Sequence, residues 1–196
     1  MRVLIIENYR QCPIDYLEQV FADLGVELTI LNVLEADKEI PQDALTRFDG
    51  LLVLGGAMGA YDDEDYPNIP KIVQALCDFH EAEKGIFAIC LGAQMLARAL
   101  GEPFKSNEGL ELGFVPLTVT EEGQKDALFE GVSKAWSPIE WHEDNFHIPA
   151  AATLMMSGEA CKNQAFKAGR ASYAFQFHPE ISGPGICTMV AGLDAP

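Results

Sequence analysis

The first hundred residues alternate between short apolar runs and segments whose apolar residues recur with the period of an α-helix. The apolar runs occupy residues 3–6, 26–31, 51–54 and 86–89. Runs this short and this continuously apolar are typical of parallel strands that are buried on both faces of a sheet. Their alternation with helices predicts right-handed crossovers and a three-layer α/β fold with a mostly parallel, doubly wound sheet.

Three segments have helical spacing. Their apolar faces are carried by Ile14, Leu17, Phe21 and Leu24, by Ile69, Ile72, Val73, Leu76 and His80, and by Leu91, Met95 and Ala99. Pro13 would open the first helix and Gly25 would end it, while Gly101 and Pro103 would end the third.

The second half of the chain has a different pattern. Segments 114–120, 153–157 and 172–177 are typical of strands and have little helix between them. We expect this half to add antiparallel strands to the sheet and to bring His178 back toward it.

Cys90 lies where an apolar run gives way to the third helical segment. A strand ending at Cys90 and a helix beginning at Leu91 would hold the sulfur on a tight turn, where the helix N-terminus favours a thiolate. Ala88 and Gly92 are small enough to permit a turn like the one that carries the nucleophile in serine hydrolases. By itself the segment fits either a nucleophile or a buried cysteine that packs as a small apolar residue.

A histidine and a carboxylate follow an aromatic, strand-like segment as His178-Pro179-Glu180, with His178 placed 88 residues beyond Cys90. The histidine can take a thiol proton and the carboxylate can orient the imidazole, which is the arrangement of a catalytic triad. Pro179 restricts the backbone between the two side chains. A lone histidine at a strand end is more typical of a hydrogen-bonded surface residue, but together with the cysteine turn it favours a Cys-His-Glu site.

Four segments together resemble the class I, triad-type glutamine amidotransferases, and most closely their stand-alone, GMP synthase-like members. The segments are LGGAMGAYDD at 54–63, CLGAQ at 90–94, WHEDNF at 141–146 and FQFHPE at 175–180. They occur in the family's order and extend the resemblance over residues 1–180. The resemblance implies a flavodoxin-like fold and hydrolysis of a γ-glutamyl amide, usually that of free glutamine, through a cysteine thioester.

The resemblance also implies roles for the reacting groups. Cys90 would be the nucleophile, His178 would act as general base and then as general acid, and Glu180 would hold the imidazole tautomer. The backbone N–H groups of Gly56 and Leu91 would form the oxyanion hole. Without the other segments, the glycine pair that ends at Gly56 would indicate an ordinary turn after a strand.

Substrate contacts follow from the same resemblance. Gln94 would contact the bound glutamine from one helical turn beyond Cys90. The backbone around Glu143 and Asp144 would recognise the α-amino and α-carboxylate groups of the substrate. His142, in the same segment, is more typical of a structural loop histidine than of a second base.

Two features depart from the family's pattern. The turn usually begins with glycine, where this chain has Ala88. The family also continues through a closing helix after the triad carboxylate, whereas the segment 183–185, Gly-Pro-Gly, is poor helix-forming sequence. We therefore divide the chain into a glutamine amidotransferase domain over residues 1–180 and an atypical Gly/Pro-containing C-terminal tail over 181–196, which we expect to affect stability, oligomeric state or activity.

Composition limits the partners. With 196 residues and 48% hydrophobic content, the chain is long enough to bury one sizeable core. A net charge of -17 with only 13 Lys and Arg argues against nucleic acid as a partner. No apolar stretch reaches the roughly 18 residues of a membrane span, and the first residues do not resemble a signal peptide. We expect a cytoplasmic protein that acts on a small molecule.

We expect no metal and no cofactor. The five cysteines are odd in number and include no Cys-x-x-Cys pair, which argues against a disulfide framework or a zinc site. The acidic run at 62–65 is more typical of a solvated loop, here beside the mouth of the active site, than of a metal site.

Three functions remain open. The first is a glutaminase that hands ammonia to a synthetase on another polypeptide, and the second is a γ-glutamyl peptidase or hydrolase that acts on small γ-glutamyl compounds. The third is a non-catalytic, amidotransferase-like module. A cysteine hydrolase of the other elbow-bearing α/β folds fits less well, because those folds lack a late His-Pro-Glu.

Overall fold

A computed structural model describes residues 1–10, 12, 14–33, 38–102, 104–105 and 110–191. Within these ranges a nine-stranded sheet runs in the order β2-β1-β3-β4-β13-β12-β11-β7-β8. Its strands are β1 (Arg2–Glu7), β2 (Glu27–Asn32), β3 (Gly50–Val53), β4 (Gly85–Ile89), β7 (Leu117–Val119), β8 (Ala135–Trp136), β11 (Ala152–Ser157), β12 (Ala165–Ala168) and β13 (Ser172–Phe175). Two smaller sheets pair β5 (Phe104–Lys105) with β10 (Asn145–Phe146) and β6 (Glu111–Phe114) with β9 (Ile139–His142).

The helices are α1 (Tyr16–Asp23), α2 (Ala44–Arg47), α3 (Ile69–Glu81), α4 (Leu91–Ala99) and α5 (Gly183–Ala191), with 3-10 turns at Gly123–Lys125 and Ala127–Phe129. Helix α1 begins at Tyr16, and the expected opening at Pro13 lies outside the described residues, as does the stop expected at Pro103. The described helices include none that is long and apolar enough to cross a membrane.

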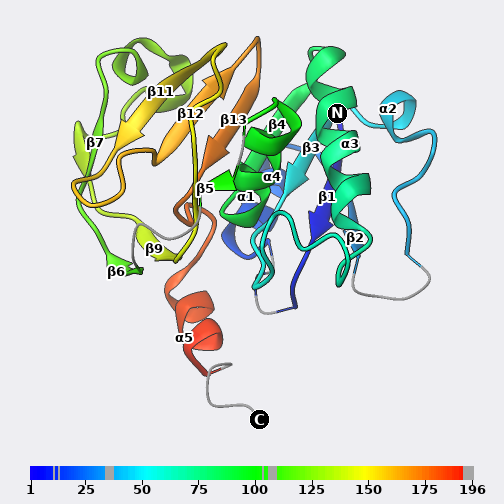
Figure 1. Ribbon diagram of the computed structural model, residues 1–196, viewed down its shortest axis with the longest axis horizontal. Coiled ribbons are helices and arrows are strands. Elements are labelled where there is room, and N and C mark those ends of the chain that lie inside the picture. Colours follow the sequence, from blue (N-terminus) through cyan, green and yellow to red (C-terminus); the bar gives the residue numbers. More distant parts are fainter. Residues whose placement is uncertain (11, 13, 34–37, 103, 106–109, 192–196) are drawn as a thin grey trace.

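The sheet is parallel in one half and antiparallel in the other. Strands β2, β1, β3, β4 and β13 run parallel, and β12, β11, β7 and β8 continue the sheet antiparallel. This confirms the mostly parallel sheet with added antiparallel strands. Strand β13 is where the halves meet, because it pairs in parallel with β4 and antiparallel with β12 (Figure 1).

Helices cover both faces of the parallel half, which confirms the three-layer α/β architecture. Successive residues of a strand point to opposite faces. Leu51 and Val53 of β3 therefore pack in a cluster with Leu76 of α3, whereas Leu52 packs in a second cluster with Ile14, just before α1. Figure 1 shows α3 lying across the parallel strands.

The expected single strand over 114–120 is wrong. The structure divides it into β6, which pairs with β9, and β7, which joins the main sheet. Pro116 lies between them. Proline has no N–H for a ladder and restricts the residue before it, so the segment turns from one sheet to the other.

The Gly/Pro-containing segment after Glu180 is expected to disfavour a helix. This expectation is also wrong, because Gly183–Ala191 forms α5. Pro184 lies in the first turn, where its missing N–H is not needed. The Ser182 hydroxyl accepts a hydrogen bond from the Gly185 N–H at 3.2 Å, which caps the helix. Figure 1 shows α5 extending away from the sheet.

Candidate active site

Cys90 occupies a strained turn between β4 and α4. Its backbone has φ 52° and ψ −110°, a conformation that residues with a side chain adopt rarely. The turn needs Gly92, because a Cβ there would overlap the carbonyl oxygen of Val53 in the neighbouring strand. Ala88, in the position where glycine is usual, is fully buried in β4. The turn therefore forms with alanine at that position.

His178 and Glu180 form a buried pair just beyond β13. Nδ1 of His178 lies 2.7 Å from Oε1 of Glu180, and the two residues are 3% and 0% exposed. A carboxylate accepts, so Nδ1 carries the hydrogen and Nε2 is left to receive a proton. The backbone of His178 is fixed as well, because its N–H donates to the carbonyl oxygen of Ile139 at 3.0 Å.

The structure brings His178 to Cys90. Strand β13 pairs with β4 so that Phe175 lies opposite Ile89, and both chains then leave the sheet at the same edge. Burial alone would lower the pKa of His178. The negative charges of Glu180 and Cys90, with hydrogen bonds to both side chains, outweigh burial and raise the pKa of His178 well above its ordinary value.

Gly55 lies beside both Cys90 and His178. A Cβ at Gly55 would lie 3.1 Å from Cε1 of His178 and 3.4 Å from Cβ of Cys90. The same Cβ would lie 3.8 Å from Sγ of Cys12. Burial raises the pKa of Cys12 to about 12, with smaller contributions from Cys90 and Glu180. Cys12 is therefore a neutral thiol near pH 7.

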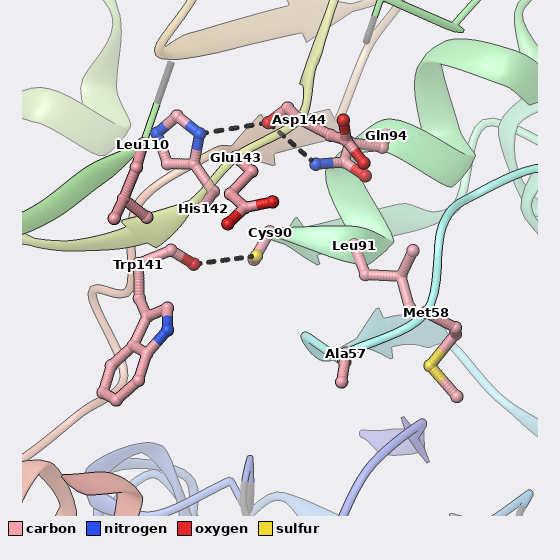
Figure 2. Close-up of a pocket in the computed structure, with 11 residues that line it drawn as sticks. Ala57, Met58, Cys90, Leu91, Gln94, Leu110, Trp141, His142, Glu143 and Asp144 are labelled. Atoms are coloured by element: carbon pink, nitrogen blue, oxygen red, sulfur yellow. Dashed lines mark hydrogen bonds between the residues drawn. The ribbon is translucent and has the colours of Figure 1, made fainter. Parts of the chain in front are cut away.

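A pocket of about 320 Å³ opens in front of Cys90 (Figure 2). Its lining includes five further residues predicted from the sequence, namely Gly56, Leu91, Gln94, Glu143 and Asp144. His178 and Glu180 are not among the lining residues. A Cβ at Gly56 would lie 2.8 Å from Cδ2 of Leu91, so the two residues proposed for the oxyanion hole are neighbours.

Hydrogen bonds hold the far wall of the pocket. Nε2 of Gln94 donates to the carbonyl oxygen of Asp144 at 3.1 Å and to Oε1 of Gln176 at 3.3 Å. Nδ1 of His142 donates to the same Asp144 carbonyl at 3.0 Å. His142 is itself a lining residue, and this bond holds the neighbouring backbone of the pocket wall.

Sequence reasoning missed four lining residues, Ala57, Met58, Leu110 and Trp141. Sγ of Cys90 lies 3.9 Å from the carbonyl oxygen of Trp141 (Figure 2). Trp141 and Met58 lie in the segments that resemble the family. Their positions near Glu143 and Gly56 in the sequence could have identified them as lining residues. Leu110 lies outside those segments and had no such signal.

The acidic run at 62–65 does not line this pocket. Asp63 forms two hydrogen bonds of 2.7 Å with the guanidinium of Arg98 on α4, and these lower the pKa of Asp63. Arg98 also donates to the carbonyl oxygen of Ala60 at 2.7 Å. These contacts tie the loop after Gly56 to the helix that begins beside Cys90.

A second group of ionisable side chains lies at the pocket wall and includes the lining residue His142. Ligating atoms of Glu111, His142 and Cys161 lie within 4.8 Å of one another, and all three residues are buried. Glu140 lies beside them and is fully buried. Burial raises the pKa of Glu140, and the neighbouring His142 only partly offsets this effect.

Comparison with known proteins places this geometry in a family. The family model described as "Glutamine amidotransferase class-I" matches residues 4–185. The chain is 31% identical over 185 residues to a glutamine-hydrolysing GMP synthase subunit of Thermoplasma volcanium, which covers 92% of this chain and 84% of that protein. It is 26% identical over 168 residues to "Gamma-glutamyl peptidase 3" of Arabidopsis thaliana, with 83% and 66% covered.

A solved structure gives the same picture. The crystal structure of a glutamine amidotransferase from Thermotoga maritima superposes with a TM-score of 0.88 at 27% identity, covering 98% of this chain and 81% of that one. Some relatives are longer than this chain, which spans 62 to 66% of the length of three of them, the Arabidopsis peptidase included.

Proposed function

Because the chain belongs to the class I glutamine amidotransferase family, we propose that it hydrolyses a γ-glutamyl amide, with glutamine as the simplest substrate. The observation that carries the proposal is the contact of a buried His178–Glu180 pair with Cys90 on its strained turn, beside a pocket that admits a small molecule. A nucleophile, a base and a group that orients the base are the parts that covalent hydrolysis requires.

In the proposed first half-reaction, the Cys90 thiolate attacks the γ-carbonyl carbon of the substrate. The N–H groups of Gly56 and Leu91 stabilise the oxyanion, a contribution of about 10²–10³ in rate for one such donor. The tetrahedral intermediate collapses with transfer of the His178 proton to the leaving nitrogen. Ammonia or an amine departs, and the γ-glutamyl group stays bound to Cys90 as a thioester.

In the second half-reaction, His178 takes a proton from water, and the resulting hydroxide attacks the thioester. The intermediate expels the Cys90 thiolate, releases glutamate and leaves His178 protonated, as it was at the start. Glu180 keeps the hydrogen on Nδ1 throughout, so that Nε2 faces the reacting atoms.

We assign recognition of the γ-glutamyl group to the wall opposite Gly56. Glu143 and Asp144 line this wall, and the backbone around them binds the substrate's α-amino and α-carboxylate groups. Gln94 lines the same wall and contacts the substrate, while its bond to Asp144 fixes its amide. We also propose a cytoplasmic location, and we propose that ammonia passes to a separate synthetase subunit.

A γ-glutamyl peptidase is the second candidate, and Leu110 is the observation that favours it. This residue lines the pocket although 58% of its surface is exposed. An apolar rim of this kind suits the residue that follows the γ-glutamyl bond in a small peptide better than it suits ammonia.

The experiment is release of glutamate by the purified protein from glutamine and from γ-glutamyl dipeptides, with Cys90→Ala as the control. We expect Cys90-dependent turnover, and a higher kcat/KM for dipeptides would identify a peptidase. Labelling of Cys90 by the glutamine analogue 6-diazo-5-oxo-L-norleucine, detected by mass spectrometry, tests the reactivity of the nucleophile. This assay needs no synthetase subunit. Folded protein that neither turns over nor is labelled would refute both candidates and leave the non-catalytic module.

A further inference from the structure

We propose that Glu111, Glu140, His142 and Cys161 form a binding site for a divalent transition-metal ion, of which Zn²⁺ is the best match. The site shares His142 with the lining of the active-site pocket, but the proposal does not rest on the proposed hydrolysis. The proposal departs from the expectation, drawn from the sequence, that the chain binds no metal.

Strand pairing assembles the site. Strand β6 runs antiparallel to β9 with Glu111 opposite His142 and Gly113 opposite Glu140. Glu140 and His142 are two residues apart and so point to the same side. These polar side chains are buried, whereas the apolar Leu112 and Phe114 of β6 are 54% and 68% exposed. Burial of a carboxylate is costly unless the carboxylate is paired or binds a metal ion.

The histidine is oriented as a metal ligand. Nδ1 of His142 faces the carbonyl oxygen of Asp144, which can only accept, so Nδ1 carries the hydrogen. In the neutral ring, Nε2 then presents its lone pair to Oε2 of Glu111 and Oε2 of Glu140, each 3.1 Å away. Ligating histidines in metal sites commonly donate their other N–H to a carbonyl in this way.

Several ligand atoms have no hydrogen-bond partner among the described residues. They are Nε2 of His142, Oε1 of Glu111 and both carboxylate oxygens of Glu140, and each residue is more than nine-tenths buried. Two carboxylate oxygens thus converge on one imidazole nitrogen, each at 3.1 Å. A metal ion can bind all three groups at once, whereas a single proton on Nε2 satisfies at most two acceptors weakly.

The distances from His142 to the two carboxylates, and a small cavity beside Glu111, agree with a metal ion. Tetrahedral zinc with bonds of about 2.0 Å separates its ligand atoms by about 3.3 Å, close to the 3.1 Å observed here. A cavity of about 60 Å³ is bordered by Glu111, His142 and Cys161. That volume exceeds the space of one water molecule, so an ion fits.

Cys161 supplies the fourth ligand and selects the metal. Its Sγ accepts a hydrogen bond from Nδ2 of Asn145 at 2.5 Å and, as a thiol, donates one to the carbonyl oxygen of Asn163 at 3.7 Å. Metal binding releases the thiol proton of Cys161 and forms the sulfur–metal bond. A set of sulfur, imidazole and carboxylate ligands suits zinc, and a thiolate disfavours magnesium and calcium. Gln164 supports the site from behind by donating to Oε2 of Glu111 at 2.7 Å.

The test is a titration of chelator-treated, full-length protein with Zn²⁺ against a chromogenic competitor, together with Co²⁺ loading. We expect one equivalent of Zn²⁺ per chain and a sulfur-to-cobalt charge-transfer band. Cys161→Ser should abolish the band and weaken Zn²⁺ binding at least about tenfold, and Glu140→Gln should weaken binding with the band retained.

Two controls separate this site from other thiols. Cys90→Ala and Cys77→Ser should keep both the stoichiometry and the band, because neither sulfur belongs to the cluster. Loss of the band in Cys90→Ala, with retention in Cys161→Ser, would place the metal at the catalytic thiol and overturn the proposal. So would a wild-type protein that binds no equivalent of Zn²⁺. X-ray absorption of the wild-type zinc complex needs no variant, and any sulfur count other than one would reject the site.

Discussion

The N–H of Cys90 donates a hydrogen bond of 2.7 Å to the carbonyl oxygen of Phe175. This bond joins the end of β4 to the end of β13, two strands that are far apart in the chain and adjacent in the sheet. Phe175 lies three residues before His178, so the bond holds the backbone of Cys90 close to that histidine. The proposed chemistry depends on this contact because it fixes the reacting thiol relative to its base.

We predict that Cys90→Ala removes hydrolysis without unfolding the protein. Alanine keeps the Cβ and removes only a buried sulfur, so we expect the free energy of unfolding to change by about 1 kcal/mol or less. Loss of the nucleophile should lower kcat by about 10⁴-fold or more. Initial rates and urea denaturation of the same preparation measure both effects, and a variant that fails to fold would identify Cys90 as structural.

Glu180→Gln should move the alkaline limb of the pH–rate profile to lower pH. Departure of the amine needs a protonated His178, so activity falls as pH rises through the pKa of that residue. Glu180 and Cys90 raise this pKa against the effect of burial. Cys12, a neutral thiol, and the buried Glu140 also interact electrostatically with groups of this site.

With Glu180 neutralised, burial of His178 weighs more and its pKa falls, which gives the sign of the shift. We also expect kcat to drop about 10²-fold or more. The measurement is kcat against pH for wild type and variant. Equal alkaline limbs in the two proteins would show that Glu180 does not tune His178.

Gly92→Ala should destabilise the protein and remove activity. The added Cβ would overlap the Val53 carbonyl oxygen, which belongs to the backbone of a central strand and cannot move aside. We expect a loss of about 2–3 kcal/mol in the free energy of unfolding. Gly85→Ala is the matched control, because a Cβ at Gly85 meets nothing within 4 Å and should change stability by about 0.5 kcal/mol or less. Equal stability of the two variants in urea would contradict the prediction.

Asp15 and Ser182 should show energetic coupling. The Asp15 carboxylate accepts hydrogen bonds from the backbone N–H of Ser182 at 2.7 Å and from its hydroxyl at 2.8 Å. Tyr16 then donates its N–H to the carbonyl oxygen of Glu180 at 3.1 Å, so this corner holds the segment that carries the triad carboxylate. A double-mutant cycle of Asp15→Asn and Ser182→Ala should give a coupling of about 1 kcal/mol or more in unfolding free energy.

Both single variants should also lower kcat by more than they raise KM, because they loosen Glu180 and leave the pocket wall intact. Asp23→Asn, on the exposed end of α1, is the control for removal of one negative charge. Additive effects on stability would show that the Asp15–Ser182 contact is not energetically significant.

The parallel half of the fold was predictable because its signals are local. Short apolar runs and helical spacing located β1, β2, β3, β4, α3 and α4 to within two residues at each end. The turn at Cys90 was predictable for the same reason, since the change from strand to helix spacing occurs within a few residues. The prediction of a single strand over 114–120 was wrong because the apolar pattern continues across Pro116. Tertiary pairing decides which sheet each part joins.

Helix α5 was missed for a related reason. The low helix propensity of its glycines and proline argued against a helix. A propensity scale does not include the cap by Ser182 or the contact of Ser182 with Asp15. The helix start thus depends on a residue 167 positions away in the chain.

The sequence alone determined which side chains are candidates for the chemistry, because residue identities and their family resemblance are properties of the chain. Only the tertiary structure decided which of them meet. Parallel pairing of β4 with β13 placed His178 beside Cys90, and antiparallel pairing of β6 with β9 placed Glu111 beside His142. Strand pairing is a non-local interaction that depends on register and burial across the whole sheet. The residues of the candidate triad could therefore be named from the sequence, whereas the buried Glu111, Glu140, His142 and Cys161 cluster could not.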